Sequence, residues 1–237
     1  MVIHSGRLWR LTSFKYRWDL SGDNAEEMRI FDRIAIEFPE KEVFLRLGGN
    51  SFKTVLAGGM TTEFARHCAK AYAAVAPCGR YKVSAISLSL PDVVVCDGEE
   101  IFLGRDFVSQ AEGAEYLWCG AVSIGHELEK LMEESDSMSL RAIYDASGSE
   151  CADAAMDVLF HLAGNELLRR GLVLSPRRFS PGYGDMPLVL QKFFYHKLNM
   201  AEMGVTLTEK MFLVPEKSVT AFAFIHSLQG KSKNDQM

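Results

Sequence analysis

A run of apolar and small side chains between Ser149 and Gly171 places the strongest constraint on how this chain can fold. Its members recur at steps of three and four residues, which puts them on one face of an α-helix. They are Ala152, Ala155, Met156, Leu159, Phe160, Ala163 and Leu167. Arg169 and Arg170 in the last turn, followed by Gly171, are typical of a helix C-terminus. A helix this long with an apolar face needs a large partner, so we expect it at the centre of the fold.

Segments rich in β-forming residues surround this helix and predict that its partner is a sheet. Cys96-Asp97-Gly98-Glu99 places an Asp-Gly turn between two short apolar runs, which is a strong hairpin signal. We expect strands at residues 81–90, 93–96, 101–103, 116–124, 203–207, 211–214 and 218–224, and a partly alternating strand at 28–38. We expect further helices at residues 39–47, 61–76 (with Thr61 as N-cap), 106–112, 126–134 and 187–199. The prediction is an α+β fold, a single domain with a mainly antiparallel sheet packed with helices.

At 237 residues the chain suits one large domain or two small ones, and 48% apolar with 24% charged residues give it a substantial core. Because the sequence has no internal repeat and no convincing linker, one domain is the simpler interpretation. We assign this domain to residues 28–228. Residues 1–27 are expected to be an N-terminal arm of uncertain structure, and residues 229–237 a frayed polar tail.

Charge and hydropathy bear on partners and location. The formal net charge is −5 and there is no basic stripe, so we do not expect a nucleic-acid partner. No apolar run is long enough to span a membrane, and the N-terminus lacks the apolar stretch of a signal peptide. We therefore expect no membrane partner and a cytoplasmic location.

Cysteines and histidines give no metal signature. The five cysteines lack C-x-x-C spacing and fall in apolar or small-residue patterns, so we expect most to be buried free thiols. The six histidines lack the i, i+4 pairing of a helical metal site. Gly125 precedes a helix, but no glycine-rich phosphate-binding motif surrounds it and the helix carries four glutamates. We predict no protein-ligated metal and no phosphate-binding loop.

Residues 178–187, Arg-Phe-Ser-Pro-Gly-Tyr-Gly-Asp-Met-Pro, form the candidate site. Arg178 offers a planar fork of five donors that suits a carboxylate. Pro181-Gly182 forms a turn where backbone can approach a ligand closely, and Tyr183 presents a ring with a polar tip. Because Pro-Gly turns are common, a surface turn with an incidental arginine is the alternative interpretation of these ten residues.

Two motifs in the last quarter of the chain point to a family. Arg178-x-x-x-Gly182-Tyr183 resembles the R-x-x-x-G-Y signature of the S-adenosylmethionine-binding activation domain of cobalamin-dependent methionine synthase. Residues 203–222 resemble that domain's later G-x-x-L-T-E…P-x-x-S-V-S-G segment, in the same order and at a compatible distance. Two motifs in register are fairly specific. Looser similarity to stand-alone relatives of this activation domain occurs at residues 39–48, 120–125 and 144–149.

The resemblance implies a ligand and gives roles to residues of the turn. The ligand is S-adenosylmethionine, and Arg178 would hold its carboxylate. The backbone at Ser180 and Gly182 would approach the adenosine or methionine part. Tyr183 would face the corrin ring of a cobalamin carried by a partner protein, which makes it the residue with a catalytic role.

The resemblance also implies an acidic side chain from the long helix at the ligand's amino group. The candidates there are Asp153, Asp157 and Glu166, while an ungapped comparison places His161 at the expected position. A solvated helix face is the alternative for all four. Two positions depart from the family pattern, because Gly184 stands where proline is usual and Ala223 stands where an aromatic residue is expected.

The implied activity is reductive reactivation, in which cob(II)alamin is reduced by a flavodoxin-type electron donor and remethylated by S-adenosylmethionine. This is a positioning task, which suits a chain with no obvious catalytic triad. We expect the chain to act in trans on a separate cobalamin-dependent methionine synthase. It could instead activate another corrinoid methyltransferase, or be a binding or structural descendant that no longer uses S-adenosylmethionine. Arg178 and Tyr183 favour the first two, whereas Ala223 and the unassigned acidic residue favour the third.

Overall fold

The computed structural model describes residues 16–18, 28–49, 58–90, 93–102, 107 and 111–228. The expected tail at residues 229–237 lies outside the described residues, as does the expected arm apart from the strand at Tyr16–Trp18. Of the helix expected at residues 106–112, the described residues are Phe107 and Ala111, which are helical, and Glu112, which lies in a turn.

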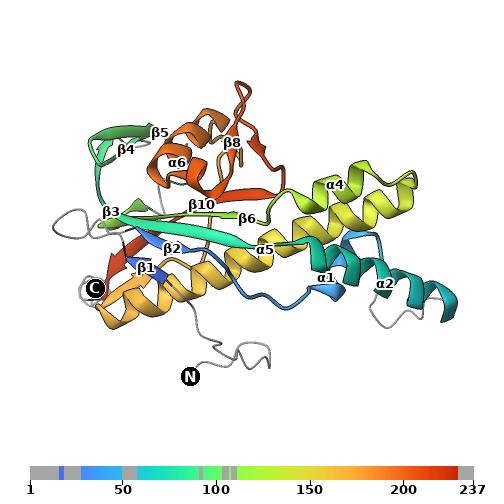
Figure 1. Ribbon diagram of the computed structural model, residues 1–237. Helices are drawn as coiled ribbons and strands as arrows, with labels where there is room; N and C mark the ends of the chain where they lie inside the picture. Colours follow the sequence, from blue (N-terminus) through green and yellow to red (C-terminus); the bar gives the residue numbers. More distant parts are fainter. Residues whose placement is uncertain are drawn as a thin grey trace.

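An antiparallel sheet forms the centre of the molecule (Figure 1). Its strands are β1 (Tyr16–Trp18), β2 (Arg29–Phe31), β3 (Cys78–Leu90), β6 (Tyr116–Ser123), β10 (Ser218–Ser227) and β7 (Leu172–Leu174), in this spatial order. A hairpin of β4 (Val93–Cys96) and β5 (Glu99–Phe102) pairs with the C-terminal half of β3. Asp97 and Gly98 both have positive φ, +53° and +80°, so the predicted Asp-Gly hairpin turn is confirmed.

Helical elements cover both faces of the sheet (Figure 1). The long helix α5 (Met138–Arg169) crosses one face, and its N-terminal half extends beyond the sheet to pack against α1 (Glu40–Arg46), α2 (Gly58–Ala74) and α4 (Glu127–Glu133). The other face carries η1 (Leu188–Leu190), α6 (Gln191–Lys197), η2 (Met200–Met203) and the strand pair β8 (Thr206–Leu207) and β9 (Leu213–Val214). The predicted α+β class and the central position of the long helix are both confirmed.

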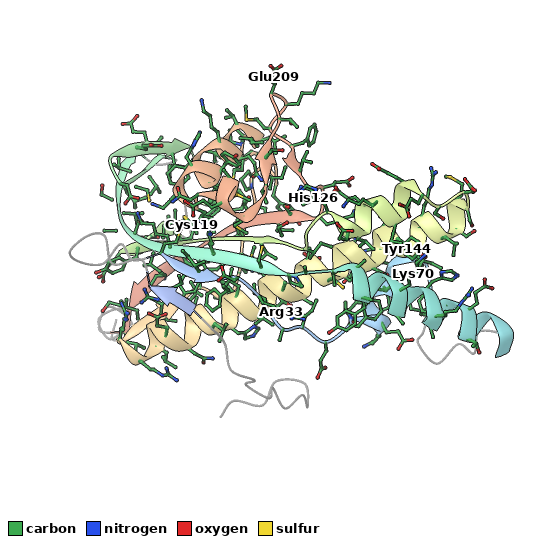
Figure 2. The ribbon with its side chains drawn as sticks, in the orientation of Figure 1. Arg33, Lys70, Cys119, His126, Tyr144 and Glu209 are labelled. Atoms are coloured by element: carbon green, nitrogen blue, oxygen red, sulfur yellow. The ribbon has the colours of Figure 1, made fainter. Side chains whose placement is uncertain are left out.

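Alternate side chains of β10 enter the two hydrophobic clusters on the two faces of the sheet. Phe222 and Phe224 are buried in the cluster under α6, whereas Ala221, Ala223 and Ile225 are buried in the cluster under α5. Ala223, at the position where the family resemblance predicts an aromatic ring, therefore contributes a small side chain to the packing of α5 on the sheet. Side chains fill the layers on both sides (Figure 2).

The cysteines are free thiols, and most are buried as predicted. Cys68, Cys96, Cys119 and Cys151 are buried and Cys78 is half-buried. Burial raises the pKa of the Cys151 thiol to about 12, so it stays protonated and unreactive near neutral pH.

The start of α5 was predicted wrongly. The helix begins at Met138, where the Ser137 hydroxyl accepts a hydrogen bond from the Leu140 N–H at 3.4 Å, and not at Ser149. The apolar pattern from Ala152 to Leu167 does not mark the eleven residues of the helix that precede Ser149. In the structure the helix continues through Ser147 and Gly148, and the Ser147 hydroxyl donates to the Ile143 carbonyl one turn back at 2.7 Å.

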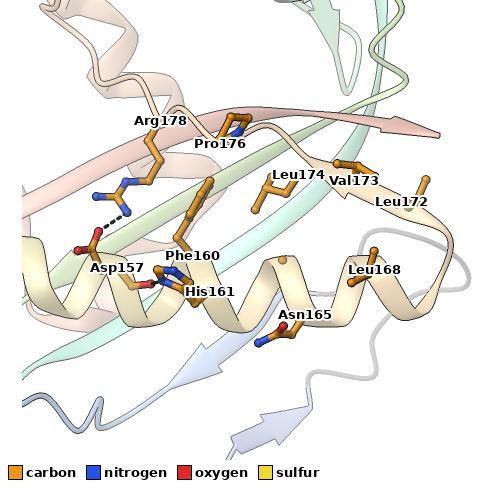
Figure 3. A pocket seen from close by; sticks show the side chains of 11 residues that line it. Asp157, Phe160, His161, Asn165, Leu168, Leu172, Val173, Leu174, Pro176 and Arg178 are labelled. Carbon is orange, nitrogen blue, oxygen red and sulfur yellow. Dashed lines mark hydrogen bonds and ion pairs between the residues drawn. The ribbon is translucent and has the colours of Figure 1, made fainter. Parts of the chain in front are cut away.

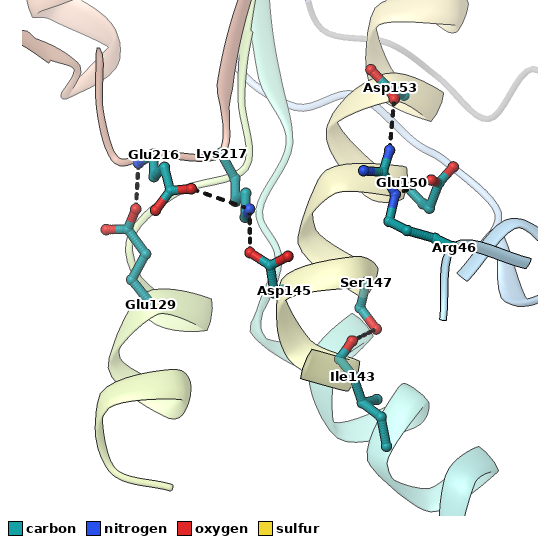
Figure 4. A network of polar contacts seen from close by, with 9 residues as sticks. All are labelled: Arg46, Glu129, Ile143, Asp145, Ser147, Glu150, Asp153, Glu216 and Lys217. Atoms are coloured by element: carbon teal, nitrogen blue, oxygen red, sulfur yellow. Dashed lines mark hydrogen bonds and ion pairs between the residues drawn. The ribbon is translucent and has the colours of Figure 1, made fainter. Parts of the chain in front are cut away.

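Gly148 is required by close packing. A Cβ at this position would lie 2.8 Å from Leu128 Cδ2 and 3.0 Å from Lys217 Cγ. Two ion pairs lie on the same half of α5 (Figure 4): Lys217 Nζ lies 2.6 Å from Asp145 Oδ1, and Arg46 Nε of α1 lies 2.5 Å from Glu150 Oε1. They tie β10 and α1 to the N-terminal half of α5.

Other element boundaries also differ from the prediction. The strand expected at residues 28–38 ends at Phe31, and beyond it Ile34 makes a single bond of 2.7 Å to the Pro77 carbonyl. Helix α2 begins at Gly58, so Thr61 is not its N-cap. The strands expected at residues 203–207 and 211–214 are shortened, because Met203 belongs to the 3-10 helix η2 and Met211 has a φ of +64°. The short edge strand β7 was not predicted.

Candidate functional site

The chain leaving β7 places Arg178 on the α5 side of the sheet. Its neighbour Phe179 exchanges two backbone hydrogen bonds with Phe222, at 2.9 and 2.8 Å, and its ring packs 4.5 Å from the ring of Phe107. Because successive side chains of an extended segment point to opposite faces, burial of Phe179 under α6 directs Arg178 toward α5.

Arg178 lies at one end of a groove between α5 and residues 172–178, here called the β7 segment (Figure 3). The groove has a volume of about 700 Å³, within the range of small-molecule sites. Its lining comes from two segments: Asp157, Phe160, His161, Gly164, Asn165 and Leu168 of α5, and Leu172, Val173, Leu174, Pro176 and Arg178. The lining is charged at the Arg178 end and mainly apolar at the other.

An arginine and a carboxylate face each other at the charged end. Arg178 Nη1 donates to Asp157 Oδ1 at 2.5 Å, and the guanidinium carbon lies 5.2 Å from the centre of the Phe160 ring. The side chains of Arg178 and Asp157 are 25% and 57% exposed, so a ligand can reach both. His161 stands one turn further along α5, with Nδ1 2.7 Å from the Asp157 carbonyl oxygen.

The structure separates the acidic candidates of α5. Glu166 faces β2 and β3, where it accepts hydrogen bonds from Arg29 at 2.7 Å and from the Tyr81 hydroxyl at 2.5 Å. Burial alone would raise the pKa of the Glu166 carboxyl, but these hydrogen bonds outweigh it and lower the pKa. Asp153 lies 3.7 Å from Arg46. Of the four positions proposed for the amino-group contact, only Asp157 forms an ion pair with Arg178 among the described residues.

The rest of the predicted site, Ser180, Gly182 and Tyr183, does not line the groove. The turn is closed by bonds from the Tyr183 N–H to the Ser180 carbonyl at 3.1 Å and from the Gly182 N–H to the Met186 carbonyl at 3.2 Å. Gly182 and Gly184 have φ of +86° and +60°, which a proline at residue 184 could not adopt. Tyr183 is 71% exposed. Its role toward a corrin, and those of Ser180 and Gly182 toward a ligand, stay predictions.

Sequence reasoning missed the apolar half of the groove. Phe160 belongs to the predicted apolar pattern and Leu168 does not, yet both line the groove. Periodicity cannot tell which residues of a helix face the sheet and which border an open edge. Gly164 carried a usable signal, because a glycine in the interior of a helix costs stability and needs a reason.

A solved structure shares this architecture, although no family model and no curated protein matches the sequence. It is a crystal structure of the MetH reactivation domain bound to AdoHcy. The superposition has a TM-score of 0.59 at 15% sequence identity, and it covers 82% of this chain and 79% of that chain. The chain has the fold of that reactivation domain. At this identity, the likeness establishes the fold alone.

Two further features, a metal-binding cluster and a membrane-spanning helix, concern the residues that the structure describes. Within that part of the chain, no group of three or more histidine, cysteine, aspartate or glutamate side chains is arranged to hold a metal ion. None of its helices has both the length and the apolar character that crossing a membrane requires.

Proposed function

We propose that this protein binds S-adenosylmethionine in the groove between α5 and β7 and supports reductive remethylation of cob(II)alamin on a separate cobalamin-dependent methionine synthase. The observation that carries the proposal is the Arg178–Asp157 pair at the groove's charged end. The shared fold with a reactivation domain crystallised with AdoHcy supports it.

The two side chains match the charges of an α-amino acid. The ligand's carboxylate would take the place of Asp157 on the planar fork of Arg178, and its ammonium group would turn to the freed Asp157 carboxylate. This exchange replaces one ion pair by two. A plain carboxylate would satisfy Arg178 but leave Asp157 without a partner, so the site should prefer an amino acid.

Two contacts orient Arg178 before the ligand arrives. The Phe160 ring lies beside its guanidinium, and Phe179 fixes the backbone on its C-terminal side. A preorganised donor loses less conformational entropy on binding than a free side chain does. S-adenosylmethionine would supply the methyl group, and the residues of this chain would hold it in position without acid–base chemistry.

The partner side of the proposal rests on the exposed turn. Tyr183 is 71% exposed, so the corrin of a separate methionine synthase could meet it. The electron would come from a flavodoxin-type donor. Another corrinoid methyltransferase would present the same ring, so the choice of partner is a matter for reconstitution with purified proteins.

Calorimetry with AdoHcy, the demethylated form of the ligand, tests the groove. We expect Arg178→Lys to weaken binding at least tenfold, because lysine keeps the charge but loses the fork; tenfold corresponds to about 1.4 kcal/mol. Asp157→Asn should weaken binding by a similar factor through loss of the ammonium partner. The matched controls Arg177→Lys and Asp153→Asn change neighbouring residues that do not line the groove and should leave affinity unchanged.

Equal affinities for the wild type and both groove variants would place the ligand elsewhere. An effect of Asp153→Asn without one of Asp157→Asn would transfer the ammonium contact to Asp153. Absence of binding by the wild type at millimolar AdoHcy would remove the proposed ligand altogether.

A further inference from the structure

Gly164 lies in the interior of α5 without a packing reason. Its backbone would accept a side chain, since the nearest atom to an added Cβ is Leu174 Cδ2 at 3.9 Å, an ordinary contact distance. Glycine at an interior helix position is less favourable than alanine by about 1 kcal/mol. Gly148 of the same helix is different, because a Cβ there would lie 2.8 Å from Leu128 Cδ2 and 3.0 Å from Lys217 Cγ, so these side chains would have to shift.

Gly164 keeps the apolar half of the groove open, because it has no side chain. Phe160, Gly164 and Leu168 are spaced by four residues and so form one stripe along α5. Leu174 faces this stripe from the β7 segment (Figure 3). A larger residue at 164 would project between Phe160 and Leu168 and fill the groove. The open strip is apolar and bounded on two sides, which suits a flat, largely apolar group.

We infer that Gly164 is the floor of a platform for the purine base of a nucleoside thioether, held against Leu168 and Leu174. This inference rests on the proposed function, since the amino-acid end of the same ligand is placed on Arg178 and Asp157. It assigns the apolar half of the groove to the nucleoside end of the ligand.

The spacing along the helix supports this division of the ligand. Seven residues separate Asp157 from Gly164, which is about 10 Å at 1.5 Å per residue. In AdoHcy a homocysteine chain and a ribose separate the amino group from the purine, so one extended molecule can reach both ends of the groove. Asn165 lies on the α5 rim beside Gly164 and adds an amide with a donor and an acceptor, the kinds of group that an adenine edge pairs with.

The inference is tested with two ligands and one blocking substitution. Gly164→Leu fills the strip without touching the charged end, and Ala142→Leu adds the same side chain at an exposed position of α5 outside the groove. Binding of AdoHcy and of 5′-deoxy-5′-methylthioadenosine, which carries the nucleoside but no amino acid, is measured by calorimetry and ligand-observed NMR. Thermal unfolding of each variant checks that the fold is intact.

We expect Gly164→Leu to weaken both ligands at least tenfold and Ala142→Leu to weaken neither. Arg178→Lys should weaken AdoHcy but leave methylthioadenosine unchanged. Gly164→Leu could bind AdoHcy with wild-type affinity while Arg178→Lys binds it more weakly. In that case the purine platform is wrong and the proposed function stands.

A different result would contradict the proposed function and leave the purine platform intact. If the wild type ignores AdoHcy but binds methylthioadenosine in a way that Gly164→Leu abolishes, the platform stands and the amino-acid end of the proposed site is wrong. Binding of neither ligand overturns both.

Discussion

The two halves of α5 place a glycine in opposite surroundings. Around Gly148 the helix is enclosed by α4 and the start of β10, and Leu128 and Lys217 would contact an added Cβ at 2.8 and 3.0 Å. Around Gly164 the helix borders an open groove, and the nearest atom would be 3.9 Å away. One glycine permits close packing, whereas the other leaves a space. The N-terminal half of α5 therefore serves stability, and the C-terminal half leaves room for a ligand.

The ion pairs of the two halves follow the same division. The Lys217 side chain, which pairs with Asp145, is 10% exposed and ties β10 to α5. Arg178 and Asp157 are more exposed, at 25% and 57%, and lie at the end of a groove. Exposed pairs contribute little to stability, so a ligand can displace this one at small cost.

The sharpest way to break the comparison is the same substitution at both glycines. Gly148→Leu should lower the free energy of unfolding by about 1–3 kcal/mol or more, since the leucine must displace the packed Leu128 and Lys217 side chains. Gly164→Leu should leave it unchanged or raise it by up to about 1 kcal/mol, because leucine favours a helix more than glycine does. Urea denaturation followed by circular dichroism measures both. Similar losses at the two positions would show that the groove is as closely packed as the α4 contact.

Glu166 lies on the same half of α5 as Gly164 but faces β2 and β3 and not the groove. A substitution there separates an effect on stability from an effect on binding. Glu166 accepts from Arg29, Tyr81 and Arg170, so Glu166→Gln should lower the free energy of unfolding by about 1–2 kcal/mol at neutral pH without affecting AdoHcy. Because folding lowers its pKa, the contribution of Glu166 is present above the unfolded pKa, near 4.3, and is lost as pH falls through the folded value.

The difference between the wild type and Glu166→Gln should therefore be constant from pH 7 to about pH 5 and shrink below that. Equilibrium unfolding at a series of pH values measures it, with Glu133→Gln, an exposed residue of α4, as control. A difference that grows toward acid pH would mean that folding raises the pKa of Glu166.

The sequence predicted the parts of the fold that rest on local signals. The Asp97-Gly98 turn specifies its own backbone, and the 149–171 pattern is strongly periodic. It failed at the start of α5, because the first eleven residues of this helix pack against α1, α2 and α4, which are distant in sequence. Edge strand β7 has three residues, too few for an alternating pattern.

The site divided in the same way. Arg178 was identified from its motif, and the structure places it in the groove lining. Asp157 could not be chosen over Asp153 or Glu166 from the sequence, because all three lie on one helix and their partners, Arg178, Arg46 and Arg29, come from distant parts of the chain. Gly164 was passed over because an apolar pattern counts the side chains that are present and not the space that one leaves.

The smallest effect on stability is expected at the turn, where the groove can be compared with the surface beside it. Tyr183 is 71% exposed, so Tyr183→Ala should change the free energy of unfolding by less than about 0.5 kcal/mol and leave AdoHcy affinity unchanged. With a cognate corrinoid protein in the cob(II) state, an electron donor and S-adenosylmethionine, the same variant should slow formation of methylcobalamin, because the ring is proposed to meet the corrin. Absorption spectroscopy follows that reaction, and Arg178→Lys at saturating ligand is the comparison.

Loss of AdoHcy binding with methylation retained at saturating ligand would move Tyr183 into the nucleoside site. No acceleration by the wild-type protein with any corrinoid partner would leave a descendant that keeps the fold and the groove without the repair activity.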